Sequence, residues 1–362
     1  MIDLRSDTVT QPTPEMRRAM AEAPVGDAVI DTDPTTERLE RFTAELLGKE
    51  SALFMPSGTM TNQIGIRLHC DRGSELICEA DAHVYHYEQG AFAQLSGIVA
   101  HTIAGKGGVL TLDQLQGEIR PDNDHMVRTR LVCLENTHNR WGGLVLPQDE
   151  VVRLCEWATA SGLKTHLDGA RLWNAAAATG TEVAELAKPF DSVSVCFSKG
   201  LGAPVGSALV GERDFIREAK RARKLFGGGM RQSGILAAGA LHALEHHRER
   251  LVVDHANAQS LADAACRSNA LRLRGHDDNT NTNSGTGKRV GTNIVTLEID
   301  PTWGDADEFR KRLLSEQVDC FAIGPQAVRL VTHLDVSSDQ IEQACAALTR
   351  VASDSSTKSR PA

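Results

Sequence analysis

The chain of 362 residues lacks any long apolar run, since no stretch approaches the roughly 20 apolar residues that span a bilayer. It also lacks a clustered lysine and arginine tract, and its net charge is -9. Nucleic acids and anionic membranes attract basic patches, so neither is an expected partner and a small molecule is favoured. The first residues, 1–7, contain no apolar signal segment, and we expect a cytoplasmic protein.

Patterned cysteine and histidine spacing is missing too. The eight cysteines stand singly, without a Cys-x-x-Cys pair, which favours reduced core residues over a metal cluster or disulfide framework. His242 and His246 lie four residues apart, but no third ligand follows at metal spacing. A solvated helix face is favoured over a zinc site there, and we predict no metal.

What is present is an alternation of short apolar strands with longer helical patterns from about residue 50 to about residue 250. Such alternation predicts an α/β domain with a mainly parallel sheet, which binds ligands at the carboxyl ends of its strands. The predicted strands are 51–54, 75–78, 131–134, 164–167, 192–197 and 207–210, and the predicted helices are 35–47, 62–69, 148–160 and 233–248.

The pattern changes at both ends of this region, which predicts four parts. Residues 1–14 carry two prolines and no helical period, so we expect an arm over the surface or over a partner subunit. A large domain is expected over 15–250, a smaller α+β domain over 251–352, and a disordered tail over 353–362. Within the smaller domain the predicted helices are 251–269, 305–316 and 338–352, the predicted strands are 293–299 and 327–331, and the polar run 275–287 is expected to be flexible.

Lys199 is the most informative residue, because it follows the apolar run 192–197 in the segment Ser-Lys-Gly. Burial at a strand end penalises a charged amine, and a neutral amine can attack a carbonyl. Asp168 follows a second apolar strand, and a carboxylate there can keep a pyridine nitrogen protonated. Alone, each could be a solvated lysine or a capping acid. Together they predict a pyridoxal phosphate site with a Schiff base on Lys199.

Two neighbouring segments fit the same cofactor. Residues 56–62 follow a strand and open a helix, and a helix N-terminus binds phosphate. Read alone, Ser-Gly-Thr at that place is also an ordinary helix cap. His83 follows another strand and can stack on a pyridine ring, although a structural histidine would look the same.

Several arginines compete for the anionic groups of a substrate. An α-carboxylate favours the planar fork of arginine, and Arg171 is preferred because it lies three residues past Asp168. The other candidates are Arg5, Arg231 and Arg329. The glycines at 227–229 join two helical patterns and suit either an active-site rim shared between subunits or a flexible linker.

Taken together, these segments resemble the low-specificity L-threonine aldolases, which are fold-type I pyridoxal phosphate enzymes. The resemblance covers nearly the whole chain, through the segments 3–10, 135–139, 166–171, 198–206, 227–234 and 328–333. It implies a large domain with a mainly parallel seven-stranded sheet and a smaller C-terminal domain. It also implies cleavage of L-threonine or a related amino acid to glycine and an aldehyde, in a homotetramer of dimers that share their active sites.

The resemblance implies which residues bind the cofactor. Lys199 would hold its aldehyde, Asp168 its ring nitrogen, and His83 would stack on its ring. The segment of Gly58, Thr59 and Met60 is similar to the family's phosphate cradle. Three basic residues are further implied at the cofactor or a neighbouring subunit's site: Arg171, Lys224 and Arg231.

The resemblance also implies a clamp for the substrate carboxylate, formed by Ser6, Arg171 and Arg329. His125, ten residues before Glu135, resembles a second histidine near the substrate hydroxyl. The catalytic base is left open among His83, His125 and a water molecule held by them.

One departure from the family pattern concerns a tyrosine and glycine that this chain replaces with Ile30 and Asp31. Isoleucine cannot donate the tyrosine hydrogen bond, so we expect a different substrate range or rate. Trp141 is a second residue that can reshape the pocket. The alternatives are β-elimination or racemisation of another amino acid, or a catalytically idle protein that keeps the fold.

Overall fold

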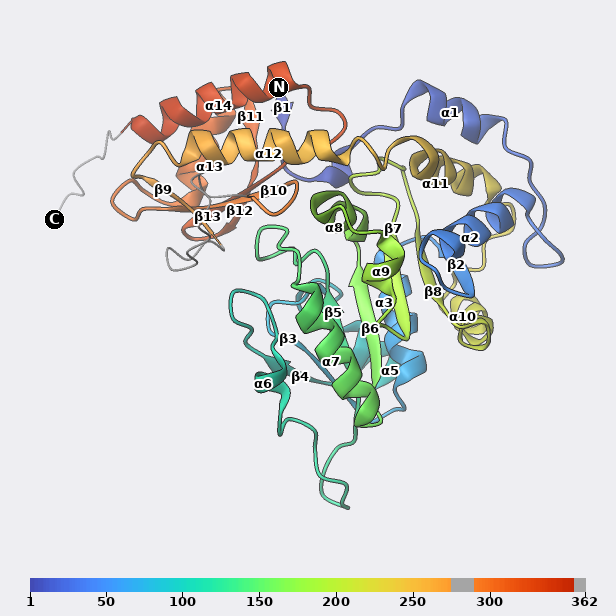
Figure 1. The fold of residues 1–362 in the computed structure, drawn as a ribbon. Coiled ribbons are helices and arrows are strands. Elements are labelled where there is room, and N and C mark those ends of the chain that lie inside the picture. The colour runs from blue at the N-terminus through green and yellow to red at the C-terminus, as the bar shows by residue number, and fades with distance from the viewer. Residues whose placement is uncertain (275–289, 355–362) are drawn as a thin grey trace.

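The computed structural model describes residues 1–274 and 290–354 (Figure 1). The polar run 275–287 and residues 355–362 of the predicted tail lie outside the described residues. A larger sheet covered by helices lies below a smaller domain in Figure 1. Within the described ranges, no helix combines the length and apolar character needed to cross a membrane.

The larger sheet has seven strands in the order β2-β8-β7-β6-β5-β3-β4. The pairs from β4 to β7 are parallel, and β8 runs antiparallel to β7 and β2. The prediction of a mainly parallel seven-stranded sheet is confirmed. The strands are Ser51–Met55 (β2), Glu75–Glu79 (β3), Val99–Ile103 (β4), Thr129–Glu135 (β5), Lys164–Gly169 (β6), Ser192–Cys196 (β7) and Ser207–Gly211 (β8). The sequence missed β4, a partly exposed edge strand without a continuous apolar run.

Helices cover both faces of this sheet. Four were predicted within a few residues: Pro34–Leu46 (α2), Gly58–His69 (α3), Gln148–Ala160 (α7) and Gly234–His246 (α11). The others were not given ranges from the sequence, most of them because they are too short for a clear helical period. They are Asp7–Val9 (η1), Pro14–Ala21 (α1), His83–His86 (α4), Ala91–Ser96 (α5), Leu112–Leu115 (α6), Leu172–Thr179 (α8), Val183–Ala187 (α9) and Arg213–Leu225 (α10).

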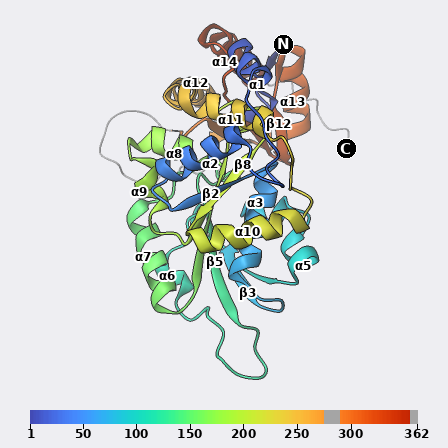
Figure 2. The same cartoon turned by 90° about the vertical axis from the view of Figure 1, so that its right-hand side faces the viewer.

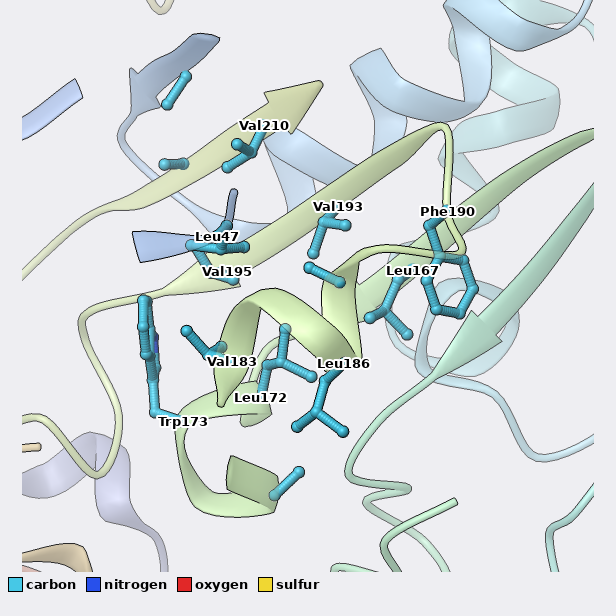
Figure 3. Close-up of a cluster of buried hydrophobic side chains, with 14 of the residues drawn as sticks. Leu47, Leu167, Leu172, Trp173, Val183, Leu186, Phe190, Val193, Val195 and Val210 are labelled. Atoms are coloured by element: carbon cyan, nitrogen blue, oxygen red, sulfur yellow. The ribbon is translucent and has the colours of Figure 1, made fainter. Parts of the chain in front are cut away.

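The two faces of β6 and β7 differ in character because side chains alternate along a strand. Leu167, Val193 and Val195 point toward α8 and α9 and join the main hydrophobic core (Figure 3). The residues between them are polar and face α3. They are His166 and Asp168 on β6 and Ser192 and Ser194 on β7.

The smaller domain has a four-stranded antiparallel sheet in the order β12-β13-β10-β9. The strands are Leu271–Leu273 (β9), Ile294–Ile299 (β10), Phe321–Gly324 (β12) and Ala327–Val331 (β13), and the helices are Leu251–Ala265 (α12), Ala306–Ser315 (α13) and Ser338–Ser353 (α14). The largest hydrophobic cluster of the described chain lies in the large domain and extends to Leu251. The second largest lies in the smaller domain, where its C-terminal part begins at Ala258.

The N-terminal arm packs on the smaller domain of its own chain. Strand Ile2–Asp3 (β1) pairs in parallel with Val318–Asp319 (β11), and Leu4 is buried in the smaller domain's core. Figure 2 shows the N-terminus beside that domain. The first residues of the arm thus lie on the chain's own smaller domain, and this brings Ser6 and Asp7 toward the sheet.

Candidate active site

A cavity of about 500 Å³ lies between the carboxyl ends of the large sheet and the smaller domain. Its walls come from the N-terminal arm, from the segments that follow β3, β5, β6 and β7, and from β12 and β13. The structure therefore brings together five of the predicted site residues, which are Ser6, His83, Arg171, Lys199 and Arg329.

Lys199 lies three residues past the end of β7, half-buried in the cavity wall. The backbone around it is held in place, because its carbonyl oxygen accepts from Gly202 N at 2.7 Å. Its side-chain amine has no hydrogen-bond partner within the part of the chain that the structure describes. An amine that is held in a cavity without a partner is available to attack a carbonyl.

Asp168 is the penultimate residue of β6 and is 2% exposed. Its Oδ2 accepts from Asn62 Nδ2 at 2.9 Å and its Oδ1 from the backbone N of Ala170 at 3.1 Å. These donors fix the orientation of the carboxylate. A buried carboxylate of this kind is suited to a protonated ring nitrogen, and that role stays a prediction.

His83 is the first residue of α4, and its backbone N donates to Glu135 Oε2 at 2.6 Å. Its Nδ1 lies 3.0 Å from Glu88 Oε1 and 4.0 Å from Asp168 Oδ2. Burial disfavours the charged imidazole, but the Glu88 hydrogen bond and the carboxylate charges outweigh burial and raise the pKa of His83. Because Nδ1 is engaged by Glu88, Nε2 is the nitrogen that can take or give a proton.

We expect Glu88→Gln to lower the pKa of His83, because the amide removes a negative charge beside the imidazole. A base acts above its pKa, so the acid limb of the kcat/KM profile should move to lower pH. NMR titration of the His83 ring measures the pKa directly. Glu118→Gln is the control, because it alters the separate His101–Glu118 pair at 2.6 Å. A His83 titration that is the same in both variants would contradict this role.

His83, Glu88 and Asp168 also have ligand atoms within 4.8 Å of one another, a spacing that a metal ion could use. Asn62 Nδ2 donates to both carboxylates, at 2.9 Å from Glu88 Oε1, and Gln63 Nε2 donates to Glu88 Oε2 at 2.5 Å. The described donors thus account for the cluster as a hydrogen-bond network. The absence of a metal stays a prediction.

Arg171 is almost fully buried and forms an ion pair with Asp7. Its Nε and one terminal nitrogen donate to the two Asp7 oxygens, both at 2.8 Å. Burial lowers the pKa of Arg171, but Asp7 outweighs it and raises the pKa overall. Asp7 thus occupies one side of the Arg171 guanidinium, while Arg171 also lines the cavity, and its role in the carboxylate clamp stays a prediction. Its other terminal nitrogen lies 3.5 Å from Asn139 Oδ1.

Arg329 also lines the cavity. One terminal nitrogen donates to Asn139 Oδ1 at 2.9 Å, while the buried Nε has no partner in the described chain. Burial, together with the charge of Arg171, lowers the pKa of Arg329. A half-buried guanidinium in a cavity wall is where an anionic group fits.

Helix α3 begins at Gly58, beside the end of β7. Ser57 caps it by accepting from Met60 N at 3.2 Å. A Cβ on Gly58 would lie 2.8 Å from Cys196 Sγ, so glycine is required for this close approach. The open N–H groups of a helix start favour phosphate, and the cradle of Gly58, Thr59 and Met60 stays a prediction that fits this position.

His125 lies outside the site of its own chain. It is exposed in the loop before β5, whereas the cavity lies past the other end of that strand. The seven residues of β5 span about 20 Å. The expectation that His125 lies near the substrate hydroxyl is therefore not met within one chain, because ten residues of sequence here include a full extended strand.

Other predicted residues also lie away from the cavity. Lys224 is exposed at the end of α10, and Arg231 forms an ion pair with Asp27. Their contact with a neighbouring subunit stays a prediction. Trp141 packs on Gly108, where a Cβ would lie 2.4 Å from the indole ring, and it does not line the cavity.

Sequence reasoning missed the partners that hold the predicted residues in place. Asp7 neutralises Arg171, Glu88 orients His83, and Asn139 contacts both cavity arginines. The sequence could have predicted that two acidic partners exist. A buried arginine such as Arg171 needs a counter-charge, and a catalytic histidine such as His83 needs a partner that orients its ring. Their identity depended on contacts between distant segments.

The chain is similar to known proteins in sequence and in fold. The beta-eliminating lyase family model matches residues 3–285. The low specificity L-threonine aldolase of Escherichia coli (strain K12) is 44% identical over 347 residues, covering 96% of this chain and 98% of that protein. The probable low-specificity L-threonine aldolase 2 of Arabidopsis thaliana is 43% identical and covers 94% of each. The structure of Leishmania major threonine aldolase has a TM-score of 0.80 at 20% identity, covering 98% of this chain and 100% of that one. At 20% identity, the similarity to the Leishmania major structure shows that the two chains share a fold.

Proposed function

This chain belongs to the beta-eliminating lyase family and, within it, to the low-specificity L-threonine aldolases, and we propose that it cleaves L-threonine, L-allo-threonine or a related L-3-hydroxy-2-amino acid to glycine and an aldehyde. One observation carries the proposal, namely a cavity whose wall holds both the amine of Lys199 and the guanidinium of Arg329. The first can hold a cofactor carbonyl, and the second can hold the carboxylate of an amino acid.

Pyridoxal phosphate is the cofactor we propose, and the residues present fit it. Lys199 supplies an amine without a partner, Asp168 a buried acceptor for the ring nitrogen, and the start of α3 at Gly58 a site for phosphate. When bound, this cofactor supplies a sink for the electron pair released as the Cα–Cβ bond breaks.

The chain's own residues supply orientation and proton transfer. Arg329 binds the substrate carboxylate through its guanidinium, with Ser6 in the same wall. Fixing the carboxylate fixes the direction of the Cα–Cβ bond. His83 takes the proton of the β-hydroxyl at Nε2, since Glu88 holds Nδ1. Its raised pKa suits a group that must exchange a proton near neutral pH.

Arg329→Lys is expected to raise KM for threonine by about 10- to 100-fold, which corresponds to one lost hydrogen bond between charged groups, with a smaller change in kcat. Lysine keeps the charge but loses the planar fork. Steady-state kinetics measure both constants. Arg5→Lys is the matched control, because the Arg5 side chain pairs with Asp3 at 2.6 Å and does not line the cavity. An equal change of KM in both variants would contradict the assignment.

The reaction itself is tested by incubating the purified protein and pyridoxal phosphate with threonine, allo-threonine and phenylserine. Glycine and the matching aldehyde in equal amounts are expected. Pyruvate or a 2-oxo acid with ammonia would show β-elimination instead, and loss of optical activity without cleavage would show racemisation. A protein that binds the cofactor without turning over any substrate would be the idle relative.

We also propose a homo-oligomer, a tetramer of dimers with shared active sites. Large apolar side chains stand exposed on the described chain, among them Ile30 at 78% and Leu225 at 68%. Burial against another copy would remove this apolar surface from water. Sedimentation velocity that finds a monomer at working concentration would overturn the assembly.

A cytoplasmic location is a further proposal. The eight cysteines are free, and six of them are buried, as suits a reducing compartment. Fractionation of the producing cells tests it, and recovery of the protein outside the cytoplasm would count against it.

A further inference from the structure

The face of α3 that packs on the large sheet carries a stripe of polar and small residues. Asn62, Gly65 and His69 follow one another at helical spacing and face β6 and β7. Asn62 is 2% exposed, and its sheet neighbour His166 is 0% exposed. Buried polar groups are unfavourable unless each is hydrogen-bonded, so this stripe requires an explanation.

A continuous chain of hydrogen bonds supplies it. His69 Nε2 lies 2.7 Å from Ser192 Oγ, which lies 2.8 Å from His166 Nδ1. His166 Nε2 lies 3.2 Å from Asn62 Oδ1. Asn62 Nδ2 lies 2.9 Å from Asp168 Oδ2, where the chain ends.

The donors of this chain have one consistent direction. Asn62 must present its NH2 group to the Asp168 carboxylate, so its oxygen accepts from His166 Nε2. Burial lowers the pKa of His166 to about 4, so the ring is neutral and Nδ1 accepts from the Ser192 hydroxyl. Ser192 in turn accepts from His69, whose pKa burial lowers to about 3. Each donor thus points toward Asp168, and aligned hydrogen bonds reinforce one another.

The packing around the chain is shaped to keep it in place. A Cβ on Gly65 would lie 2.7 Å from Cε1 of His166, so a larger residue would displace the ring from Asn62. The opposite face of the same strands carries the apolar Leu167 and Val193 (Figure 3). Polar character is thus confined to the face that leads to Asp168.

We propose that Asn62 and His166 are positioning residues that hold the Asp168 carboxylate ionised and in one orientation, and that Ser192 sets the tautomer of His166. This inference rests on the proposed function, in which Asp168 keeps the ring nitrogen of the cofactor protonated. Donors aimed at a carboxylate favour its ionised form. Loss of these donors therefore lowers the protonation of the ring nitrogen, while Lys199 and the start of α3 still bind the cofactor.

Two serines on β7 provide a matched pair of variants. Ser192 and Ser194 lie on the same face of one strand, and both are 0% exposed. The hydroxyl of Ser194 bonds to Thr61 at 2.5 Å and does not belong to the series of hydrogen bonds that leads to Asp168. Ser192→Ala and Ser194→Ala therefore each remove one buried hydroxyl, but only the first removes a member of that series. His166→Leu removes both hydrogen bonds of the ring and so interrupts the series between Ser192 and Asn62. His166→Gln can return an N–H group to Asn62 and serves as the rescue.

The test uses each full-length variant with pyridoxal phosphate labelled with nitrogen-15 in the ring, because the nitrogen chemical shift reports protonation. We expect His166→Leu, and to a smaller extent Ser192→Ala, to move the signal toward the unprotonated value. His166→Leu should lower kcat for threonine by about 10- to 100-fold with KM nearly unchanged. His166→Gln should recover most of both, and Ser194→Ala should match the unaltered protein.

An unmoved nitrogen signal in Ser192→Ala and His166→Leu, or an equal movement in Ser194→Ala, would overturn the proposal. If His166→Leu does not fold, the comparison of the two serine variants decides alone. An unaltered protein that binds the labelled cofactor but does not cleave threonine would overturn the proposed function, and the nitrogen signal would still decide this inference.

Discussion

Replacing Lys199 with alanine is expected to reduce the rate of threonine cleavage at least about 1,000-fold, because the variant loses the nucleophile for the cofactor aldehyde. No other lysine lines the cavity of the described chain. The rate is measured as aldehyde released from threonine at saturating pyridoxal phosphate. Borohydride reduction followed by peptide mass analysis should find the cofactor on Lys199 in the unaltered protein and on no peptide of the variant.

Two controls make this result specific. Lys199→Arg keeps a positive charge beside Asp7 but removes the nucleophilic amine, so it should be as inactive as the alanine variant. Lys164→Ala removes an exposed lysine that pairs with Asp191 at 2.7 Å, and it should keep full activity. Cofactor mass on a different lysine of the unaltered protein would contradict the central assignment.

Asp7→Asn is expected to lower the free energy of unfolding by about 3–5 kcal/mol, because it leaves the Arg171 guanidinium buried without a counter-charge. Urea unfolding of the cofactor-free protein measures this, since bound cofactor would add its own stabilisation. Asp214→Asn is the control, because it breaks an exposed pair with Arg217 at 2.8 Å and should change stability little. Equal changes in both variants would contradict the role of the buried pair.

The same pair predicts how stability depends on pH. Burial raises the pKa of Asp7, but the charge and hydrogen bonds of Arg171 outweigh it and hold the pKa well below the ordinary 3.8. A carboxyl with a lowered folded-state pKa stabilises the protein fully above its unfolded pKa and loses that contribution as pH falls. The difference in stability between the unaltered protein and Asp7→Asn should therefore shrink below about pH 4.

The strand ends were predictable from sequence, and the reason is local. An apolar strand that stops at a charged residue needs only a few neighbouring residues to be recognised, and Lys199 and Asp168 both have this signature. Parallel strands share one carboxyl edge, so their meeting at one site followed from the alternation of strands and helices. His83 at a third strand end was found in the same way.

The role of each arginine could not be obtained in this way. Arg171 is close to Asp168 in sequence, yet its fork is occupied by Asp7, a residue 164 positions away. His125 has the family spacing to Glu135, but spacing does not say which end of a strand a loop occupies. In both cases the contacts depend on distance in space, which distance along the chain does not give.

Local pattern was thus sufficient for the fold class, the strand ends and the cofactor hypothesis, because periodicity and strand boundaries depend on adjacent residues. Packing of remote segments determined the place of Arg329 in the cavity wall, the pairing of Asp7 with Arg171 and the hydrogen-bond chain from His69 to Asp168. The physical reason is that a buried polar group must find its partner wherever the folded chain places one, and that partner has no required position in the sequence.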